Sequence, residues 1–371
     1  MSNKHHNVKL APPTFEPWHP GDDPGRDIIV LMSGGVDSST TVLLLKRAGW
    51  NVLGITMKMP VAERCDVQRS CCGLEAAYVA RDLGIAHYYL DVRDAFRELV
   101  IEPFRQSYMD GRTPSPCVDC NTVFKFGLVW DVLESEFGVS SLATGHYARV
   151  IHEEDRVYLT RAVDKTRDQS YFLYGVPRKR LASLVLPLGD YTKDKVREIA
   201  GSAGMPVARR SDSMELCFAG EGDYRNALGE GSLAPGPVLD MSGNVLGEHD
   251  GIANFTLGQR KGLKIALGKP AYVTRINPEN NSITVGTFDE AFEAIISAHE
   301  VNVLIPEKLR PGTRLLGKIR SQGDPTVCTV LESTVATMKV EFDSPQFAPT
   351  PGQRLVLYDD DEHVVCGGVI C

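Results

Sequence analysis

The stretch Ser33-Gly34-Gly35-Val36-Asp37-Ser38-Ser39 joins two segments with different patterns and determines the fold of the first half of the chain. The apolar run 27–32 before it is typical of a buried parallel strand. The segment 40–48 after it is typical of a helix, which Gly49 ends. A glycine-rich turn before a helix N-terminus binds anions, because backbone N–H groups and the helix dipole both favour negative charge. The stretch therefore predicts a phosphate-binding loop.

The side chains of this loop suit a nucleoside triphosphate. Its glycines let the backbone approach a phosphate closely, its serines add hydroxyl donors, and Asp37 could hold Mg²⁺ beside the phosphates. No Walker pattern occurs in the chain, so the lysine that reaches the phosphates in Walker loops is absent. The string instead resembles the PP-loop of ATP pyrophosphatases, which adenylate an oxygen and release pyrophosphate. We assign to ATP binding Leu31, Met32, Ser33, Gly34, Gly35, Val36, Asp37, Ser38, Met57 and Gly145.

Composition indicates an ordinary globular chain. With 371 residues, of which 43% are hydrophobic, we expect two or three domains and no membrane partner. The proline-rich residues 1–26 have no apolar core, which predicts a polar tail rather than a signal peptide, and hence a cytoplasmic location. Nine cysteines, an odd number, favour reduced thiols, a metal site or catalysis over a disulfide framework. Because the net charge is −8, a nucleic acid would have to bind local basic patches.

Strands and helices alternate through residues 27–219, which predicts an α/β fold with a doubly wound, mostly parallel sheet. Ligands bind at the carboxyl ends of such strands, which places Ser33, Met57 and Gly145 along one edge. After Phe218 the helical periodicity disappears, and short alternating segments after Val301 predict a small closed barrel. We expect a polar tail (1–26), an ATP-binding catalytic domain (27–219), a small β-rich central domain (220–292) and a C-terminal β-barrel (293–371).

Two cysteines lie where they could carry chemistry. Cys120 lies two residues before a predicted helix at 122–137, with Asn121 as its N-cap, and a helix N-terminus stabilises a thiolate. Asp119 beside it would oppose that effect. Cys217 lies far along the chain, and the spacing alone does not bring the two cysteines together.

Longer strings resemble the bacterial tRNA-specific 2-thiouridylase family, MnmA, over roughly residues 27 to 370. The resemblance implies that ATP adenylates O2 of the wobble uridine at tRNA position 34, and that sulfur then replaces it to give 2-thiouridine, AMP and pyrophosphate. Cys217 would carry the persulfide, and Cys120 would be the nucleophile that opens it. A cysteine desulfurase or relay protein would supply the persulfide, and a reductant would reset the cysteine pair. The strings are Ser33–Ser39, Cys71-Cys72, Gly111–Asn121, Ala143–Arg149, Asp168–Leu173, Ser213–Glu221, Thr256–Leu263 and Thr350–Gln353.

The same resemblance implies contacts with tRNA. Single-stranded loops are read by splaying a base into a pocket, so uridine 34 would enter between the ATP and Cys217. The basic, glycine-flanked turn 258–264 is expected to bind phosphate through Arg260 and Lys261. Many relatives have asparagine at the position of Ser115, and some have aspartate at that of Cys117. The other implied contacts are Ser115, Pro116, Cys117, His146, Arg167, Asp168, Gln169, Arg320, Ser321 and Gln353.

Several alternatives stay open at this point. An iron–sulfur cluster on Cys117, Cys120 and Cys217 is possible but not favoured. Cys117 and Cys120 could also form half of a zinc site with Cys71 and Cys72, although that spacing is long for a compact knuckle. Another PP-loop ligase or ammonia-dependent synthetase, and a cysteine-rich, metal-binding RNA chaperone, are the other functional classes. We expect structural roles for Cys65, Cys71, Cys72, Cys328, Cys366 and Cys371.

Overall fold

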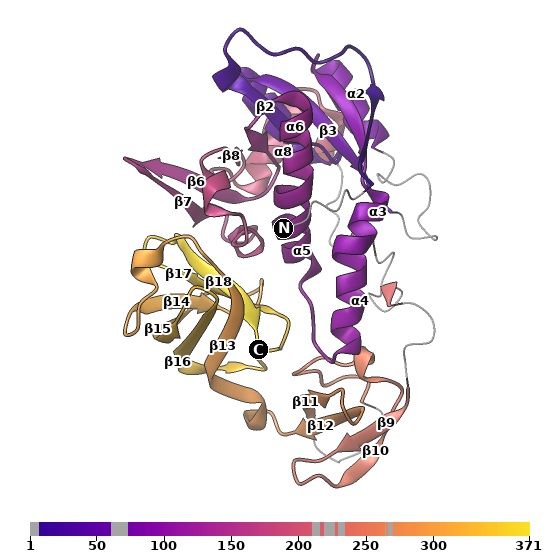
Figure 1. Cartoon of the computed structure of the whole chain (residues 1–371), viewed down its shortest axis with the longest axis vertical. Helices are drawn as coiled ribbons and strands as arrows, with labels where there is room; N and C mark the ends of the chain where they lie inside the picture. The colour runs from indigo at the N-terminus through magenta and orange to yellow at the C-terminus, as the bar shows by residue number, and fades with distance from the viewer. Residues whose placement is uncertain are drawn as a thin grey trace. The chain divides into compact units, whose positions relative to one another are not determined.

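The computed structural model describes residues 7–60, 73–209, 216–218, 227–228, 234–263, 265 and 270–371 (Figure 1). The chain divides into two compact units, residues 1–100 with 117–222 and residues 101–116 with 223–371. Cys65, Cys71 and Cys72 lie outside the described residues, so the roles suggested for them stay predictions. Within the described ranges, no helix is long and apolar enough to cross a membrane.

The first unit is built on a six-stranded sheet. Its strands are β1 (Lys9–Pro13), β2 (Asp27–Leu31), β3 (Asn51–Lys58), β4 (Ala86–Asp91), β5 (Leu142–Ala143) and β8 (Leu184–Val185), in the order β1-β4-β3-β2-β5-β8. All neighbours pair in parallel except β1 and β4. All five residues of the central strand β2 are buried, as a continuous apolar run in a parallel sheet requires. The predicted α/β class with a mostly parallel sheet is confirmed.

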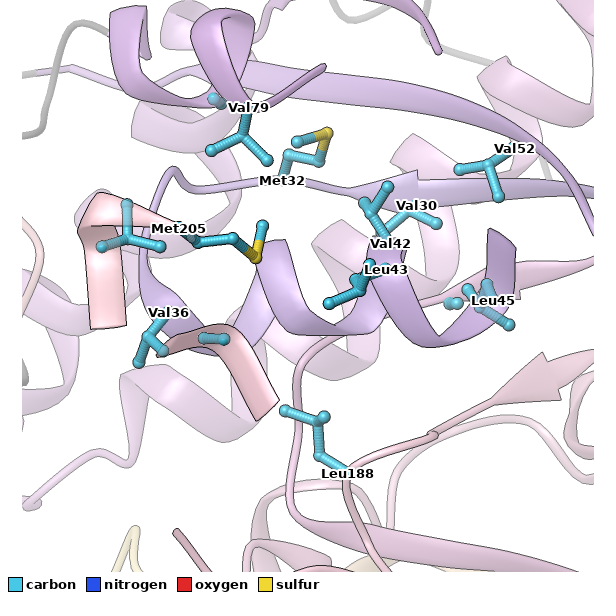
Figure 2. Packing of buried hydrophobic residues seen from close by; sticks show 14 of the residues in the cluster. Val30, Met32, Val36, Val42, Leu43, Leu45, Val52, Val79, Leu188 and Met205 are labelled. Atoms are coloured by element: carbon cyan, nitrogen blue, oxygen red, sulfur yellow. The ribbon is translucent and has the colours of Figure 1, made fainter. Parts of the chain in front are cut away.

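Helices alternate with these strands, and one hydrophobic cluster fixes the predicted loop. Val30 of β2 and Met32, which follows the strand, pack with Val42 of α1 and Val79 of α2 (Figure 2). Val196 of α8 belongs to the same cluster. Because this cluster holds the end of β2 and the start of α1, it also holds the turn between them. The α-helices are α1 (Val36–Arg47), α2 (Leu74–Asp82), α3 (Arg93–Phe96), α4 (Glu102–Met109), α5 (Pro116–Asp119), α6 (Trp130–Phe137), α7 (Arg178–Leu181) and α8 (Lys193–Ser202).

The N-terminal stretch is not entirely a polar tail. Lys9–Pro13 forms β1, which pairs with β4, and the Thr14 N–H donates to the His87 carbonyl at 2.8 Å. Trp18 also contacts Phe137 edge-on, with ring centroids 6.0 Å apart. Proline cannot donate a ladder hydrogen bond, so a proline-rich strand is confined to a sheet edge, where β1 lies.

Two helical segments differ from a plain α-helix. Residues 93–109 form one continuous helical run of α3, a π-helix η2 (Arg97–Ile101) and α4, and Pro103 lies inside it, just after the π-helical turn. The helix predicted at 122–137 begins earlier: α5 leads into a ten-residue π-helix, η3 (Cys120–Val129), and then into α6. A π-helix of this length is unusual, because most are single-turn bulges.

The second unit contains two β structures, and both were predicted. A four-stranded sheet, in the order β10-β9-β12-β11, has a small core that includes Val238, Val273 and Ile283. The C-terminal strands close into a barrel in the order β13-β16-β15-β14-β17-β18. The bounds are β9 (Gly236–Leu239), β10 (Val245–His249), β11 (Tyr272–Asn277), β12 (Ser282–Gly286), β13 (Phe292–Val303), β14 (Arg314–Lys318), β15 (Thr326–Ser333), β16 (Thr337–Phe347), β17 (Arg354–Tyr358) and β18 (Val364–Ile370). In the first unit, β6 (Ala148–Glu153) and β7 (Arg156–Arg161) form a hairpin.

Candidate active site

The phosphate-binding loop lies between β2 and α1, as predicted. Gly34 has a φ of +76°, and a Cβ there would lie 3.0 Å from the Ala76 nitrogen, so both conformation and space require glycine. The Ser38 hydroxyl oxygen accepts from the Ser33 N–H and donates to the Gly35 carbonyl, each at 3.2 Å. Gly35 is the N-cap of α1 and has no capping side chain, which leaves the start of the helix open to an anion.

A cavity of about 360 Å³ lies beside this loop, at the carboxyl ends of β2, β3 and β5. Its volume lies within the usual range for small-molecule sites. Gly34, Gly35 and Val36 do not line it. The residues predicted for ATP or tRNA that do line it are Leu31, Met32, Ser33, Asp37, Ser38, Met57, Gly145, His146, Arg167 and Gln169.

Asp37 is held by two residues that the sequence analysis did not identify. Lys193 Nζ lies 2.8 Å from both carboxylate oxygens of Asp37, and the Tyr147 hydroxyl donates to Asp37 Oδ1 at 2.7 Å. Lys193 is the first residue of α8, and its side chain is only 9% exposed although it lines the cavity. The loop therefore has a lysine beside it after all. No spacing in the sequence connects Lys193 with Asp37, and only the fold brings them together.

The donors suit a magnesium ion that arrives with a nucleotide. Among the described residues that line the cavity, Asp37 is the single carboxylate. Mg²⁺ commonly takes one or two carboxylates together with substrate phosphates and water. Lys193 occupies both oxygens of Asp37, so the ion and the lysine compete for the same group.

The loop after β5 packs closely against the start of α1. A Cβ on Gly145 would lie 2.9 Å from the Ser38 nitrogen and 3.0 Å from the Asp37 carbonyl carbon. The next residue, His146, places Nδ1 2.7 Å from Thr144 Oγ1. Burial, together with Lys125, lowers the pKa of His146 well below its usual range. His146 is therefore neutral at pH 7 and does not attract phosphate by charge.

The contact at Gly145 leads to a test of the loop. We expect Gly145→Ala to weaken ATP binding about tenfold or more, because the added methyl displaces the backbone that carries Asp37 and Ser38. Calorimetric titration with ATP measures the loss. Gly201→Ala is the matched control, since its Cβ would meet nothing closer than 4.0 Å and it lies in a helix, where alanine is favoured. An unchanged ATP affinity in Gly145→Ala would contradict the assignment of this loop to ATP.

Three thiols share one electrostatic environment around Lys125. Cys120 is 7% exposed, whereas Cys117 and Cys217 reach the surface. Desolvation by surrounding atoms, with further contributions from Cys120 and Cys117, raises the pKa of Cys217 to about 12. Lys125 lowers the pKa of all three thiols. The structure thus brings Cys120 and Cys217 into electrostatic range, which their spacing could not establish.

The expectation that Cys120 precedes a helix is wrong. The helical run begins at Pro116, so Cys120 lies inside it, and Asn121 is not an N-cap. Asn121 Nδ2 instead donates to the Phe172 carbonyl at 3.1 Å. Burial raises the pKa of Cys120 above its usual value, and Cys117 and Asp119 add to this effect. The thiolate stabilisation expected from a helix N-terminus is therefore not found.

The described thiols do not form a compact metal site. In the part of the chain that the structure describes, the ligand atoms that lie within 4.8 Å of one another belong to Asp359, Asp361 and His363. There, Asp359 Oδ2 lies 2.6 Å from Lys308 Nζ and 3.2 Å from His363 Nδ1. These contacts belong to the turn between β17 and β18. The geometry gives no support to an iron–sulfur cluster on the three cysteines.

Some implied tRNA contacts lie inside the protein. The Asp168 side chain is 1% exposed, pairs with Arg161 at 2.9 Å and accepts hydrogen bonds from the Ala162 and Ser170 N–H groups. Its carboxylate therefore stabilises the turn that carries Arg167 and Gln169. Ser115 and Pro116 are also buried.

In the second unit, Arg320, Ser321 and Gln353 line one cavity of about 410 Å³. Gln353 Nε2 donates to the carbonyls of Thr113 and Pro114 at 3.1 Å, and the Arg320 guanidinium carbon lies 5.7 Å from the Phe347 ring centroid. Gln259, which also lines this cavity, accepts from the Thr256 N–H at 3.1 Å and donates to the Lys261 carbonyl at 2.9 Å. Arg260 and Lys261 are exposed on that turn.

Comparison with known proteins covers nearly the whole chain. Residues 26–221 match the tRNA methyl transferase HUP domain, 229–287 the tRNA methyl transferase PRC-barrel domain, and 293–370 the aminomethyltransferase beta-barrel domain. The tRNA-specific 2-thiouridylase MnmA of Moorella thermoacetica is 42% identical over 353 residues, which cover 92% of this chain and 98% of that protein. The MnmA of Salinibacter ruber is 42% identical over 363 residues, which cover 92% of this chain and 94% of its own. Together with the PP-loop cavity and the paired thiols, this similarity shows that the chain belongs to the tRNA-specific 2-thiouridylase MnmA family.

Proposed function

We propose that this protein is an ATP-dependent tRNA-uridine 2-sulfurtransferase that thiolates the wobble uridine. One observation carries the proposal: Lys125 lines the same cavity as the PP-loop residues Ser33 and Asp37, and it interacts with Cys120 and Cys217. A nucleotide-activating site and a pair of thiols therefore share one region of the first unit. Family membership supports tRNA as the substrate.

The first step is adenylation of the base. O2 of uridine 34 attacks the α-phosphorus of ATP, the bond between the α-phosphorus and the bridging oxygen breaks, and pyrophosphate leaves. The amides at the start of α1 and the hydroxyls of Ser33 and Ser38 bind the phosphates. Lys193 neutralises charge on the departing pyrophosphate. Mg²⁺ bound with ATP would be held by Asp37 and would supply further charge neutralisation.

The second step transfers sulfur. The Cys217 persulfide supplies the sulfur that replaces the adenylated oxygen, with AMP as the leaving group. The Cys120 thiolate attacks Cys217 Sγ, so that a Cys120–Cys217 disulfide forms and the transferred sulfur keeps the electron pair of the bond that breaks. The sulfur reaches C2 either as released hydrosulfide or directly from the persulfide. A dithiol reductant then returns two electrons and two protons to the cysteine pair.

Binding of tRNA involves residues of both units in this proposal. Uridine 34 enters the first unit near Cys117, His146, Arg167 and Gln169, with the backbone of the turn at Asp168 beside it. Ser115 and Pro116 of the second unit are proposed as further tRNA contacts. Arg260, Lys261, Arg320, Ser321 and Gln353 bind the tRNA from the second unit, supported by the exposure of the turn and the cavity beside it. We also propose the domain bounds 27–219 (ATP-binding), 220–292 (central) and 293–371 (barrel).

The sulfur source and the cellular location complete the proposal. A persulfide donor, either a cysteine desulfurase or a relay protein, charges Cys217, whose exposed side chain supports access. A cytoplasmic location fits enzymes whose thiols must be reduced between turnovers.

Nucleoside analysis tests the function directly. Tandem mass spectrometry of bulk tRNA from cells that lack this protein is expected to show loss of 2-thiouridine at position 34 and its recovery on re-expression. With purified protein, we expect pyrophosphate release from ATP to require unmodified tRNA. Pyrophosphate release that needs ammonia but not RNA would instead identify an ammonia-dependent PP-loop synthetase, and normal 2-thiouridine in the deletion strain would refute the proposal.

A further inference from the structure

We propose that Lys125 is the cation that activates the cysteine pair for sulfur transfer, an inference that rests on the proposed function. Lys125 is a positioning residue, because it acts on the reaction through the sulfur of Cys120. The sequence analysis did not identify it, since it lies in an ordinary amphipathic stretch of a predicted helix.

The winding of η3 brings Lys125 to the same side as Cys120. In an α-helix with 3.6 residues per turn, residues five positions apart point about 140° away from each other. In a π-helix, the hydrogen bonds connect residues five positions apart, so those residues lie nearly above one another. Because η3 begins at Cys120 and continues to Val129, Lys125 lies one π-turn after Cys120. An α-helix of the same sequence would turn the lysine away from the thiol.

A buried amide holds the lysine in place. Lys125 Nζ donates to Asn121 Oδ1 at 3.1 Å, and Asn121 Nδ2 donates to the Phe172 carbonyl at 3.1 Å. Asn121 is 4% exposed, so its orientation is fixed by these two contacts. Lys125 also lines the cavity that contains Ser33 and Asp37. The partly buried Lys125 side chain therefore contacts Asn121 and lines the nucleotide cavity.

The other groups that act on the thiols oppose a thiolate. Around Cys120 these are its burial, Cys117 and the Asp119 carboxylate. Around Cys217 they are desolvation and the two other thiols, Cys120 and Cys117, whereas a backbone hydrogen bond of Cys217 itself lowers its pKa. Among the described residues, Lys125 is the charged side chain that lowers the pKa of all three thiols. Without this cation the site would contain thiols with raised pKa values, which are poor nucleophiles because the thiolate is the reactive form.

The chemistry requires negative sulfur twice. The Cys120 thiolate attacks Cys217 Sγ, the bond from Cys217 Sγ to the transferred sulfur breaks, and its electron pair leaves on the transferred sulfur. A positive charge within electrostatic range of both sulfur atoms stabilises the attacking thiolate and the departing anionic sulfur. A dithiol reductant then opens the Cys120–Cys217 disulfide.

The test measures the thiols without requiring turnover. Iodoacetamide alkylation of Cys120 is followed by peptide mass spectrometry between pH 6 and 10 in the wild type, Lys125→Met and Lys125→Arg. In Lys125→Met we expect alkylation near neutral pH to be about tenfold slower and its profile to move to higher pH, because an opposite charge nearby is worth about one pKa unit or more. Lys125→Arg keeps the charge and should restore most of the rate. Lys195→Met, an exposed lysine on α8 paired with Glu198, is the matched control.

Further measurements distinguish an effect of Lys125 on the thiols from misfolding or from a loss of nucleotide binding. Thermal melting and ATP titration report whether Lys125→Met is folded, and pyrophosphate release with tRNA reports adenylation. A shifted alkylation profile with retained pyrophosphate release supports the role of Lys125. Failure of the wild type to thiolate tRNA would refute only the proposed function, because the alkylation result does not depend on it. An alkylation profile identical to that of the wild type overturns the proposal. If ATP affinity then falls as well, Lys125 is a phosphate ligand instead.

Discussion

Cys217→Ser is expected to abolish thiolation of tRNA while leaving ATP-dependent pyrophosphate release intact. A serine hydroxyl cannot carry a persulfide, so sulfur transfer stops, whereas the PP-loop cavity retains its lining residues. Cys120→Ser should give the same separation, because the persulfide then forms but nothing opens it. We expect a loss of at least about 10³-fold in 2-thiouridine formation in single turnover, as is usual when a covalent nucleophile is removed.

The measurements that decide this prediction are thiouridine by mass spectrometry and pyrophosphate by an enzyme-coupled assay. Cys371→Ser, an exposed cysteine of the barrel unit, is the matched control and should behave as the wild type. Persulfide labelling should find sulfur on Cys217 in Cys120→Ser and none at position 217 in Cys217→Ser. Full single-turnover activity in Cys120→Ser would rule out the two-cysteine mechanism.

The pH dependence follows from the raised thiol pKa values. Burial raises the pKa of Cys120, and the reactive species is its thiolate, so the fraction of reactive enzyme increases as the pH rises toward that pKa. We expect the rate of disulfide formation between Cys120 and Cys217 to increase steadily from pH 6.5 to pH 9. Rapid-quench alkylation measures this rate, and a rate that falls over this range would contradict the thiolate mechanism.

Lys193→Met and Asp37→Asn are expected to slow the earlier step, adenylation. Lys193 is held on both oxygens of Asp37 at the edge of the phosphate-binding cavity, and both residues line it. Loss of one preorganised charge at a site of phosphoryl or acyl transfer commonly costs about 10²–10³ in rate. We therefore expect pyrophosphate release to fall by about this factor in each variant. Sulfur loading on Cys217 should be unaffected in both.

A double-mutant comparison separates catalysis from folding for this pair. Asp37→Asn leaves the nearly buried Lys193 without its charge partner, which costs stability, whereas removal of both charges relieves that cost. The double variant should thus recover melting temperature but not pyrophosphate release. Asp194→Asn, the exposed neighbour on α8, is the control. Wild-type pyrophosphate release in Lys193→Met would show that this lysine only stabilises the loop.

Local sequence patterns predicted the central strand, loop and helix well, but they missed the edge strand β1 and misplaced the start of the helix near Cys120. The apolar run 27–32 and the glycines after it were enough to predict β2, the phosphate-binding loop and α1, because each depends on residues that are near in sequence. The proline-rich N-terminus was predicted as a tail and yet contains β1, since strand pairing depends on the open edge of β4 and not on local composition. The start of the helix near Cys120 was misplaced because Pro116 is favourable in a first helical turn as well as in a loop.

The loop between β2 and α1, the mostly parallel sheet and the two β structures of the second unit could all be predicted from the sequence. The catalytic roles of Cys120 and Cys217 stay predictions. The fold, in contrast, brings Lys193 to Asp37, places Cys120 and Cys217 within electrostatic range, and puts Lys125 one π-turn after Cys120. The physical reason is that a strand, a turn or a helix is encoded by neighbouring residues. The distance between charges far apart in the chain depends instead on how whole elements pack. In this protein, the loop at Ser33–Ser39 could be found by its sequence, and the cations that complete its site could be found only in the fold.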